Sequence, residues 1–262
     1  MPNASSPLPR ILITNDDGID APGLALLEKI ARGFSDDVWV IAPETQQSGM
    51  SHSVSLNKPL RFTELAPKRF SVSGTPTDCV ITAIRAIIPE RIDLVLSGIN
   101  RGPNVADDVT HSGTAAAAME GALYHIPSIA FSQAIDFESD DPYVYWETAE
   151  KYAAEIIAKL LKNPWDKETF FNVNFPDCKP EEVKGIKCVA QGKHHFYKEL
   201  LKTEEKDGHH SYWVNWADAG ADPRRPDVDI HWLAEHYVTV TPLCLDLTHY
   251  TTLERIKKTI EL

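Results

Sequence analysis

Two adjacent carboxylates follow a short apolar run near the start of the chain. Residues 11–14 are apolar up to a threonine, and Asp16 and Asp17 come just after them. The next apolar stretch, 24–31, has helical spacing, so the segment is typical of a strand, a turn and a helix. In an open parallel sheet, ligands bind outside the carboxyl ends of the strands, where this turn would lie. Neighbouring carboxylates repel each other, and a divalent cation with oxygen ligands relieves that repulsion.

Two later apolar runs also end in polar residues. Residues 38–42 lead into a polar loop, and residues 92–96 are followed by small and amide side chains. If these two strands flank the first, their polar ends meet at one edge of the sheet. The oxygen donors that would meet there are Asp16, Asp17, Ser48 and Asn100. A set without sulfur or an imidazole pair favours Mg²⁺ or Mn²⁺ over zinc or copper.

A possible anion site precedes a helix of small residues. Ser112, Gly113 and Thr114 lie before an alanine-rich stretch that ends near residue 123. The first turn of a helix has unpaired N–H groups and the positive end of the helix dipole, which suit a phosphate, although such residues most often serve as a simple cap. His111 is a candidate to protonate a leaving group, and a structural histidine is an equally ordinary interpretation.

The composition restricts the classes of function. With 262 residues and 43% hydrophobic content, the chain can form one large α/β domain, alone or with an appendage. A net charge of −12 argues against binding a nucleic acid polymer but leaves small nucleotides open. Residues 1–9 do not resemble a targeting leader and no run is long enough to span a membrane, so we expect a cytoplasmic protein without membrane contact. The four cysteines are far apart, which predicts reduced thiols.

The element pattern predicts an α/β fold. We expect a Rossmann-like, mostly parallel sheet with helices on both faces in three layers. A helix is predicted to end at Pro89, a long amphipathic helix over 143–161, a strand over 170–175 and a last helix over about 251–260. We assign residues 10–190 to the core that carries the site. Residues 191–262 form a predicted C-terminal extension with a hairpin, the final strand and a helix.

Several motifs in chain order resemble the survival protein SurE family of nucleotidases. They are Thr14-Asn15-Asp16-Asp17-Gly18, Ala42-Pro43 with 48–53, Gly74-Thr75-Pro76 with Asp78-Cys79, Ser97 to Asn104, and His111-Ser112-Gly113-Thr114. The resemblance is strong over about 11–132 and resumes at 172–176 and 237–243.

The resemblance implies a divalent-metal-dependent phosphatase acting on nucleoside 5'-monophosphates, often with 3'-nucleotidase and sometimes exopolyphosphatase activity. It implies one Mg²⁺ or Mn²⁺ per subunit and a homodimer or homotetramer built by exchange of a C-terminal element. The implied metal ligands are Asp16, Asp17, Ser48 and Asn100. The implied phosphate contacts are Ser112, Gly113 and Thr114, with Asn15, Ser51 and Asn104 as further substrate contacts or supports. We expect Asp16, Asp17, Asn100 and His111 to take part in catalysis.

Three other classes of protein fit parts of this pattern. A receiver-type signalling domain also holds Mg²⁺ with an acidic pair, but this chain is about twice as long as that module and lacks a phosphoacceptor Asp after residues 92–96. A haloacid-dehalogenase phosphatase needs Asp-x-Asp spacing, whereas Asp16 and Asp17 are adjacent. A non-enzymatic sensor of metal and nucleotide would share all the binding residues, and only an assay separates it from an enzyme.

Overall fold

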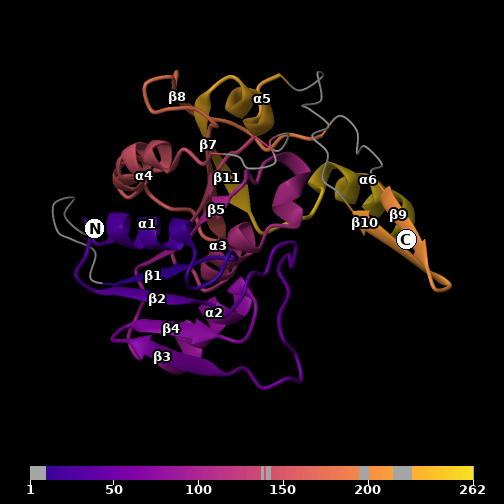
Figure 1. Ribbon diagram of the computed structural model, residues 1–262. Coiled ribbons are helices and arrows are strands. Elements are labelled where there is room, and N and C mark those ends of the chain that lie inside the picture. Colours follow the sequence, from indigo (N-terminus) through magenta and orange to yellow (C-terminus); the bar gives the residue numbers. More distant parts are fainter. Residues whose placement is uncertain (1–9, 137–138, 140–142, 195–200, 215–225, 262) are drawn as a thin grey trace.

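The computed structural model describes residues 10–136, 139, 143–194, 201–214 and 226–261. Its centre is a nine-stranded sheet in the order β3-β4-β2-β1-β5-β6-β7-β11-β8 (Figure 1). The strand bounds are β1 Ile11–Thr14, β2 Val38–Pro43, β3 Phe62–Ala66, β4 Arg69–Val72, β5 Leu94–Arg101, β6 Ser128–Gln133, β7 Thr169–Phe175, β8 Gly185–Cys188 and β11 Tyr237–Cys244. Within this sheet only the β3–β4 and β7–β11 pairs are antiparallel, which confirms a mostly parallel sheet.

Helices cover both faces of the sheet. The helices α1 (Pro22–Ala31) and α4 (Trp146–Leu160) pack with one face of the strands in a large apolar core. The helices α2 (Pro76–Thr82) and α3 (Gly113–Leu123) lie on the other face. The predicted three-layer α/β architecture is therefore confirmed. All four strands of the run from β2 through β6 point their carboxyl ends the same way, because β2, β1, β5 and β6 are mutually parallel.

Several elements differ from their predicted bounds, among them the helix predicted over 143–161, which is α4 at Trp146–Leu160. The predicted strand 92–96 is wrong at both ends, since β5 begins at Leu94 and continues through Asn100 to Arg101. The register of its pairing with β6 shifts between Ser97 and Asn100. Because of this irregularity, the strand continues beyond Ser97 and Gly98. The helix predicted to end at Pro89 consists of α2 and the short π-helical segment η1 (Ala83–Ile87).

The C-terminal part forms a hairpin, two helices and a strand of the main sheet. These elements are β9 (Leu201–Lys206), β10 (His209–Val214), α5 (Asp229–Ala234), β11 and α6 (Tyr250–Ile260). The predicted hairpin and last helix are present, and both lie to one side of the main sheet in Figure 1. The strand β11 lies between β7 and β8, although it falls within the range 191–262 assigned to the extension. The division of the chain at residue 190 stays a prediction.

Two further expectations concern the chain as a whole. Among the described residues, we find no helix both long and apolar enough to cross a membrane. The cysteines Cys79, Cys178, Cys188 and Cys244 are all free. Residues 1–9, where we expect no targeting leader, lie outside the described part of the chain.

Candidate metal and phosphate site

The turn after β1 presents Asp16 and Asp17 at the carboxyl edge of the sheet. Its geometry depends on the buried Asn15, whose Oδ1 accepts a hydrogen bond from Gly18 N at 3.2 Å and whose Nδ2 donates to Gly18 O at 2.9 Å. Gly18 has a φ of +104°, a conformation that a side chain would disfavour. The amide of Asn15 thus closes the turn and sets the direction of both carboxylates.

Backbone hydrogen bonds join the two aspartates to the segments that carry the other predicted metal ligands. Gln47 N donates to the carbonyl oxygen of Asp16 at 2.7 Å, and Arg101 N donates to Oδ2 of Asp17 at 3.1 Å. Ser48 follows Gln47 in the chain, and Asn100 precedes Arg101. The fold therefore brings together the three chain segments that contain Asp16, Asp17, Ser48 and Asn100.

The N-terminus of α3 meets the first aspartate. The hydroxyl of the buried Thr114 donates a hydrogen bond to Oδ1 of Asp16, and Ser112 caps the helix by accepting a bond from Ala115 N at 3.0 Å. A Cβ at Gly113 would lie 2.8 Å from Cβ of Asp16, so only a glycine allows this approach. The predicted phosphate-binding segment thus lies directly against the predicted metal-binding turn.

Burial shifts the titration of both carboxyls. Desolvation raises the pKa of Asp16 to about 7, against the hydrogen bond from Thr114, and the neighbouring charge of Asp17 adds to the increase. Desolvation also raises the pKa of Asp17, whereas Arg101 lowers it through its backbone N–H and its positive charge. Two desolvated carboxyls side by side favour either protonation or a bound cation.

The other oxygen donors fit such a cation by chemistry. The side chain of Asn100 donates through Nδ2 to Gly102 O at 2.8 Å, so its Oδ1 is the atom left for a cation. Ser48 is exposed, and its Oγ accepts a hydrogen bond from Nε2 of Gln46 at 3.0 Å. Among the described residues, no group of three or more His, Cys, Asp or Glu side chains could hold a metal ion. A site here would depend on oxygen donors, which suit Mg²⁺ or Mn²⁺.

Ser51 and His111 meet at the corner before α3. Ser51 Oγ donates to Thr110 O at 2.7 Å, and Ser51 N donates to His111 O at 3.1 Å. His111 itself is exposed. These contacts join the loop after β2 to the start of α3, so Ser51 has a structural role here, and its predicted substrate contact stays a prediction.

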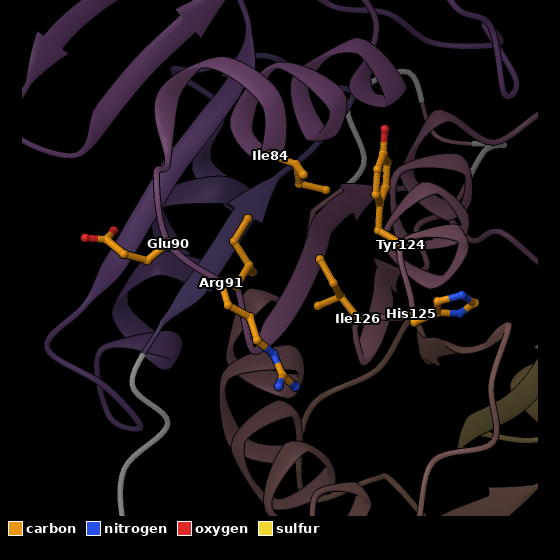
Figure 2. A pocket seen from close by; sticks show the side chains of 7 residues that line it. Ile84, Glu90, Arg91, Tyr124, His125 and Ile126 are labelled. Carbon is orange, nitrogen blue, oxygen red and sulfur yellow. The ribbon is translucent and has the colours of Figure 1, made fainter.

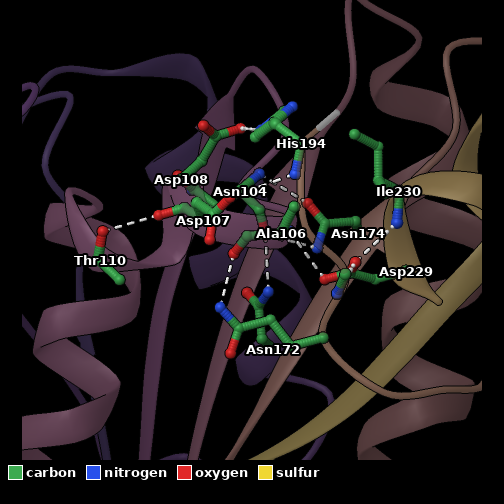
Figure 3. Close-up of polar contacts among 12 residues, drawn as sticks. Asn104, Ala106, Asp107, Asp108, Thr110, Asn172, Asn174, His194, Asp229 and Ile230 are labelled. Carbon is green, nitrogen blue, oxygen red and sulfur yellow. Dashed lines mark hydrogen bonds and ion pairs between the residues drawn. The ribbon is translucent and has the colours of Figure 1, made fainter. Parts of the chain in front are cut away.

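Asn104 belongs to a buried polar network, shown in Figure 3. Its backbone N donates to Oδ1 of Asn174 at 2.8 Å, and its Nδ2 donates to Ser132 Oγ at 2.8 Å. The side chains of Asn172 and Asn174 both donate to its carbonyl oxygen. Asn104 is therefore held by β6 and β7, and its predicted contact with substrate stays a prediction.

The same network continues to Asp229 at the start of α5. Its carboxylate accepts hydrogen bonds from the backbone N–H groups of Ala106, Gly192 and Ile230, at 3.1, 2.7 and 2.7 Å (Figure 3). Asp229 is fully buried, and desolvation raises its pKa against these bonds. The C-terminal part of the chain thus fixes the segment that leads to α3.

A pocket lies at the opposite edge of the sheet (Figure 2). The residues that line it precede β5 and β6 or follow α3, so it is at the amino ends of the parallel strands. In Figure 2 the charged ends of Glu90 and Arg91 point away from Ile84 and Ile126. This pocket is separate from the candidate site and has no converging polar groups.

The comparisons with known proteins agree with this geometry. Residues 11–198 match the family model described as survival protein SurE. A protein from Methylobacterium sp. (strain 4-46) named 5'-nucleotidase SurE is 51% identical over 255 residues, 96% of this chain and 99% of its own. The protein of that name from Brucella melitensis biotype 1 is 49% identical over 239 residues, 91% of this chain and 93% of its own. The chain belongs to the SurE family. The crystal structure of the Sure protein from Aquifex aeolicus is 37% identical, with a TM-score of 0.81 over 96% of this chain and 99% of that one.

Membership of the SurE family also decides between the rival folds. Receiver domains and haloacid-dehalogenase phosphatases share the parallel sheet, but neither is the family that matches this chain over most of its length. Gln47 contributes to the site through its backbone N–H and so carries no signal in the sequence, whereas Arg101 contributes both its backbone N–H and its positive charge. Glu120 was also missed, although an acidic residue within the run 113–123 of small residues is unusual.

Proposed function

We propose that this SurE family member is a divalent-metal-dependent 5'-nucleotidase that hydrolyses nucleoside 5'-monophosphates to nucleoside and phosphate, and that it also accepts 3'-monophosphates. The observation that carries the proposal is the contact between the buried Asp16, which is adjacent to Asp17, and the N-terminus of α3. In this proposal a cation site lies beside an anion site, an arrangement that suits metal-dependent hydrolysis of a phosphate ester. The names of the relatives support the 5'-nucleotidase activity.

The proposed ligands of the cation are the side chains of Asp16, Asp17, Ser48 and Asn100. When bound, a divalent ion supplies a water of lowered pKa and neutralises charge on the phosphate. In this proposal the phosphate oxygens lie against the start of α3, at Ser112, Gly113 and Thr114. His111, exposed at the corner before this helix, is our candidate for donating a proton to the leaving ribose oxygen.

The first test is phosphate release from a panel of 5'- and 3'-nucleoside monophosphates, with Mg²⁺, Mn²⁺ or a chelator. Native protein is compared with Asp16→Asn, which keeps the size of the side chain and removes its charge. We expect metal-dependent release that Asp16→Asn abolishes. Nucleotide binding without release under any metal would identify a non-enzymatic sensor instead.

We also propose that the protein works as a homo-oligomer, a dimer or a tetramer, assembled through residues 191–262. No residue of α6 is buried, although Tyr250 and Ile260 are large and apolar. Leu247, just before this helix, is 92% exposed. Apolar groups with so little cover in one chain favour contact with a second copy. Light scattering behind size exclusion gives the oligomer, and a monomer at micromolar concentration would contradict this assembly.

A further inference from the structure

Loop 44–61 is the long connection between β2 and β3 (Figure 1), and hydrogen bonds hold it at several points. Its first part contacts the turn after β1 and the corner before α3, as described above. Its far part contacts the start of α2, where Oδ1 of Asp78 accepts a hydrogen bond from Ser55 N at 3.0 Å and the hydroxyl of Thr75 donates to Ser53 O at 2.6 Å. Hydrogen bonds therefore hold this part of the loop on two sides, at the corner before α3 and at the start of α2.

One contact between these two ends joins two side chains. Nε2 of His52 lies 2.7 Å from Oε2 of Glu120 on α3. In each of the contacts named so far between the loop and other segments, a backbone atom takes part on at least one side. The His52–Glu120 contact is thus the one that requires a particular side chain at both positions.

The surroundings of Glu120 explain why it needs this partner. Its side chain is only 9% exposed, on a helix whose neighbouring residues are Met119 and Gly121. A carboxylate in such a place is costly unless a partner compensates for its lost hydration. The His52 side chain is 29% exposed and covers it. The pair therefore compensates for the lost hydration of the carboxylate on α3 and also joins the loop to this helix.

We propose that His52 and Glu120 form a clasp that holds loop 44–61 against α3 in the position that presents Ser48 to the metal site. Both are positioning residues, because neither belongs to the proposed ligand set. The effect on the loop follows from the contacts alone. The effect on Ser48 rests on the proposed function, in which the Ser48 hydroxyl is a metal ligand.

The loop itself is tested by hydrogen exchange of the amides in 48–56, measured by mass spectrometry on full-length protein. We expect His52→Ala and Glu120→Ala each to raise exchange in this segment about tenfold. The double variant should exchange no faster than the faster single variant, because the two residues act as one contact. Glu120→Gln keeps a hydrogen-bond acceptor of the same size and should restore most of the protection.

Glu150→Ala is the matched control. It removes a carboxylate from the ion pair with Lys29, which lies on the other face of the sheet between α1 and α4. Exchange in 48–56 should stay at the native rate in this variant. Unchanged exchange in His52→Ala, a substitution in a loop that leaves the core intact, would overturn the proposal.

Titration of metal-free protein with Mn²⁺ in a calorimeter tests the effect on Ser48. We expect the Kd to rise about tenfold in His52→Ala, while phosphate release at saturating Mn²⁺ changes much less. Faster exchange with a native Kd would overturn the role of the clasp at the metal site. Absence of Mn²⁺ binding in the native protein would instead contradict the proposed function, and the exchange data would still decide whether the clasp holds the loop.

Discussion

The hydroxyl of Thr114, in the first turn of α3, donates a hydrogen bond to the buried carboxylate of Asp16 at the end of β1. The backbone N–H of Thr114 also lowers the pKa of this carboxyl. One residue thus orients the aspartate and joins the two halves of the candidate site. Because this contact stabilises the charged form, it partly offsets the desolvation that raises the pKa of Asp16.

Removal of the Thr114 hydroxyl should lower the rate of phosphate release because it changes the pKa of Asp16. In Thr114→Val the shape is kept and the bond is lost, so the pKa of Asp16 should rise further. We expect phosphate release to fall about tenfold or more, and the acidic limb of its pH profile to move to higher pH. Thr114→Ser should recover most of the activity.

Thr110→Val is a suitable control for that change, since Thr110 donates its hydroxyl to Asp107 O at an exposed position. It should leave the pH profile where it is. An equal fall in rate for both variants, with unshifted profiles, would contradict a role of Thr114 through Asp16.

The pKa of Asp16 predicts how the stability of the metal-free protein depends on pH. Its folded value, about 7, lies above the ordinary 3.8, so the folded state binds the proton more tightly than the unfolded state. Stability therefore falls as the pH rises from about 4 to 7, by up to about 4 kcal/mol. Urea unfolding at a series of pH values measures this slope, and Asp16→Asn should flatten it.

A bound cation should reverse this loss of stability with rising pH. It competes with the proton for the same carboxyl, so stabilisation by Mn²⁺ should be larger at pH 8 than at pH 6. Thermal unfolding with and without Mn²⁺ provides the measurement. Equal stabilisation at both values would mean that the cation binds away from Asp16.

Local patterns in the sequence were enough to predict much of the site. The acidic turn 15–18 and the helix start at 112–114 each depend on neighbours in the chain, and both are where the pattern placed them. Alternating apolar strands and amphipathic helices likewise predicted the three layers. The approach of the segments that contain Ser48 and Asn100 to the aspartates depended on strand order, which the sequence only suggested.

What the pattern missed depends on partners that are distant in the chain. Asn104 and Asn174 meet across 70 positions, and nothing local in the sequence indicates that the Asn174 side chain bonds the backbone of Asn104. The extension of β5 to Arg101 depends on pairing with β6, because isolated small residues such as Gly98 do not favour a strand. Long-range pairing overrode local propensity at both places.

Gly113 should tolerate no side chain. A Cβ there would lie 2.8 Å from Cβ of Asp16 and 3.2 Å from Cγ of Pro76, and both neighbours are held by their own elements. We expect Gly113→Ala to lose nearly all phosphate release and about 1 to 3 kcal/mol of stability. Gly33→Ala, whose Cβ would meet only Ile30 O at 3.1 Å, is the control and should stay active. An active Gly113→Ala enzyme would mean that the start of α3 is not close to the reacting phosphate.

The carboxylate of Asp229 should be needed to hold the segment at Ala106, which leads to α3, in its position. Asn at this position keeps an oxygen for Gly192 and Ile230 but turns an NH₂ group toward the N–H of Ala106, where the carboxylate now accepts. Such a clash at a buried site costs about 1 to 3 kcal/mol. Urea unfolding should show this loss in Asp229→Asn, and exchange of the Ala106 amide should become faster.

Asp227→Asn, at an exposed residue that accepts from Nε1 of Trp232, should change neither. Native exchange at Ala106 in Asp229→Asn would show that the backbone of this segment holds its position without the carboxylate.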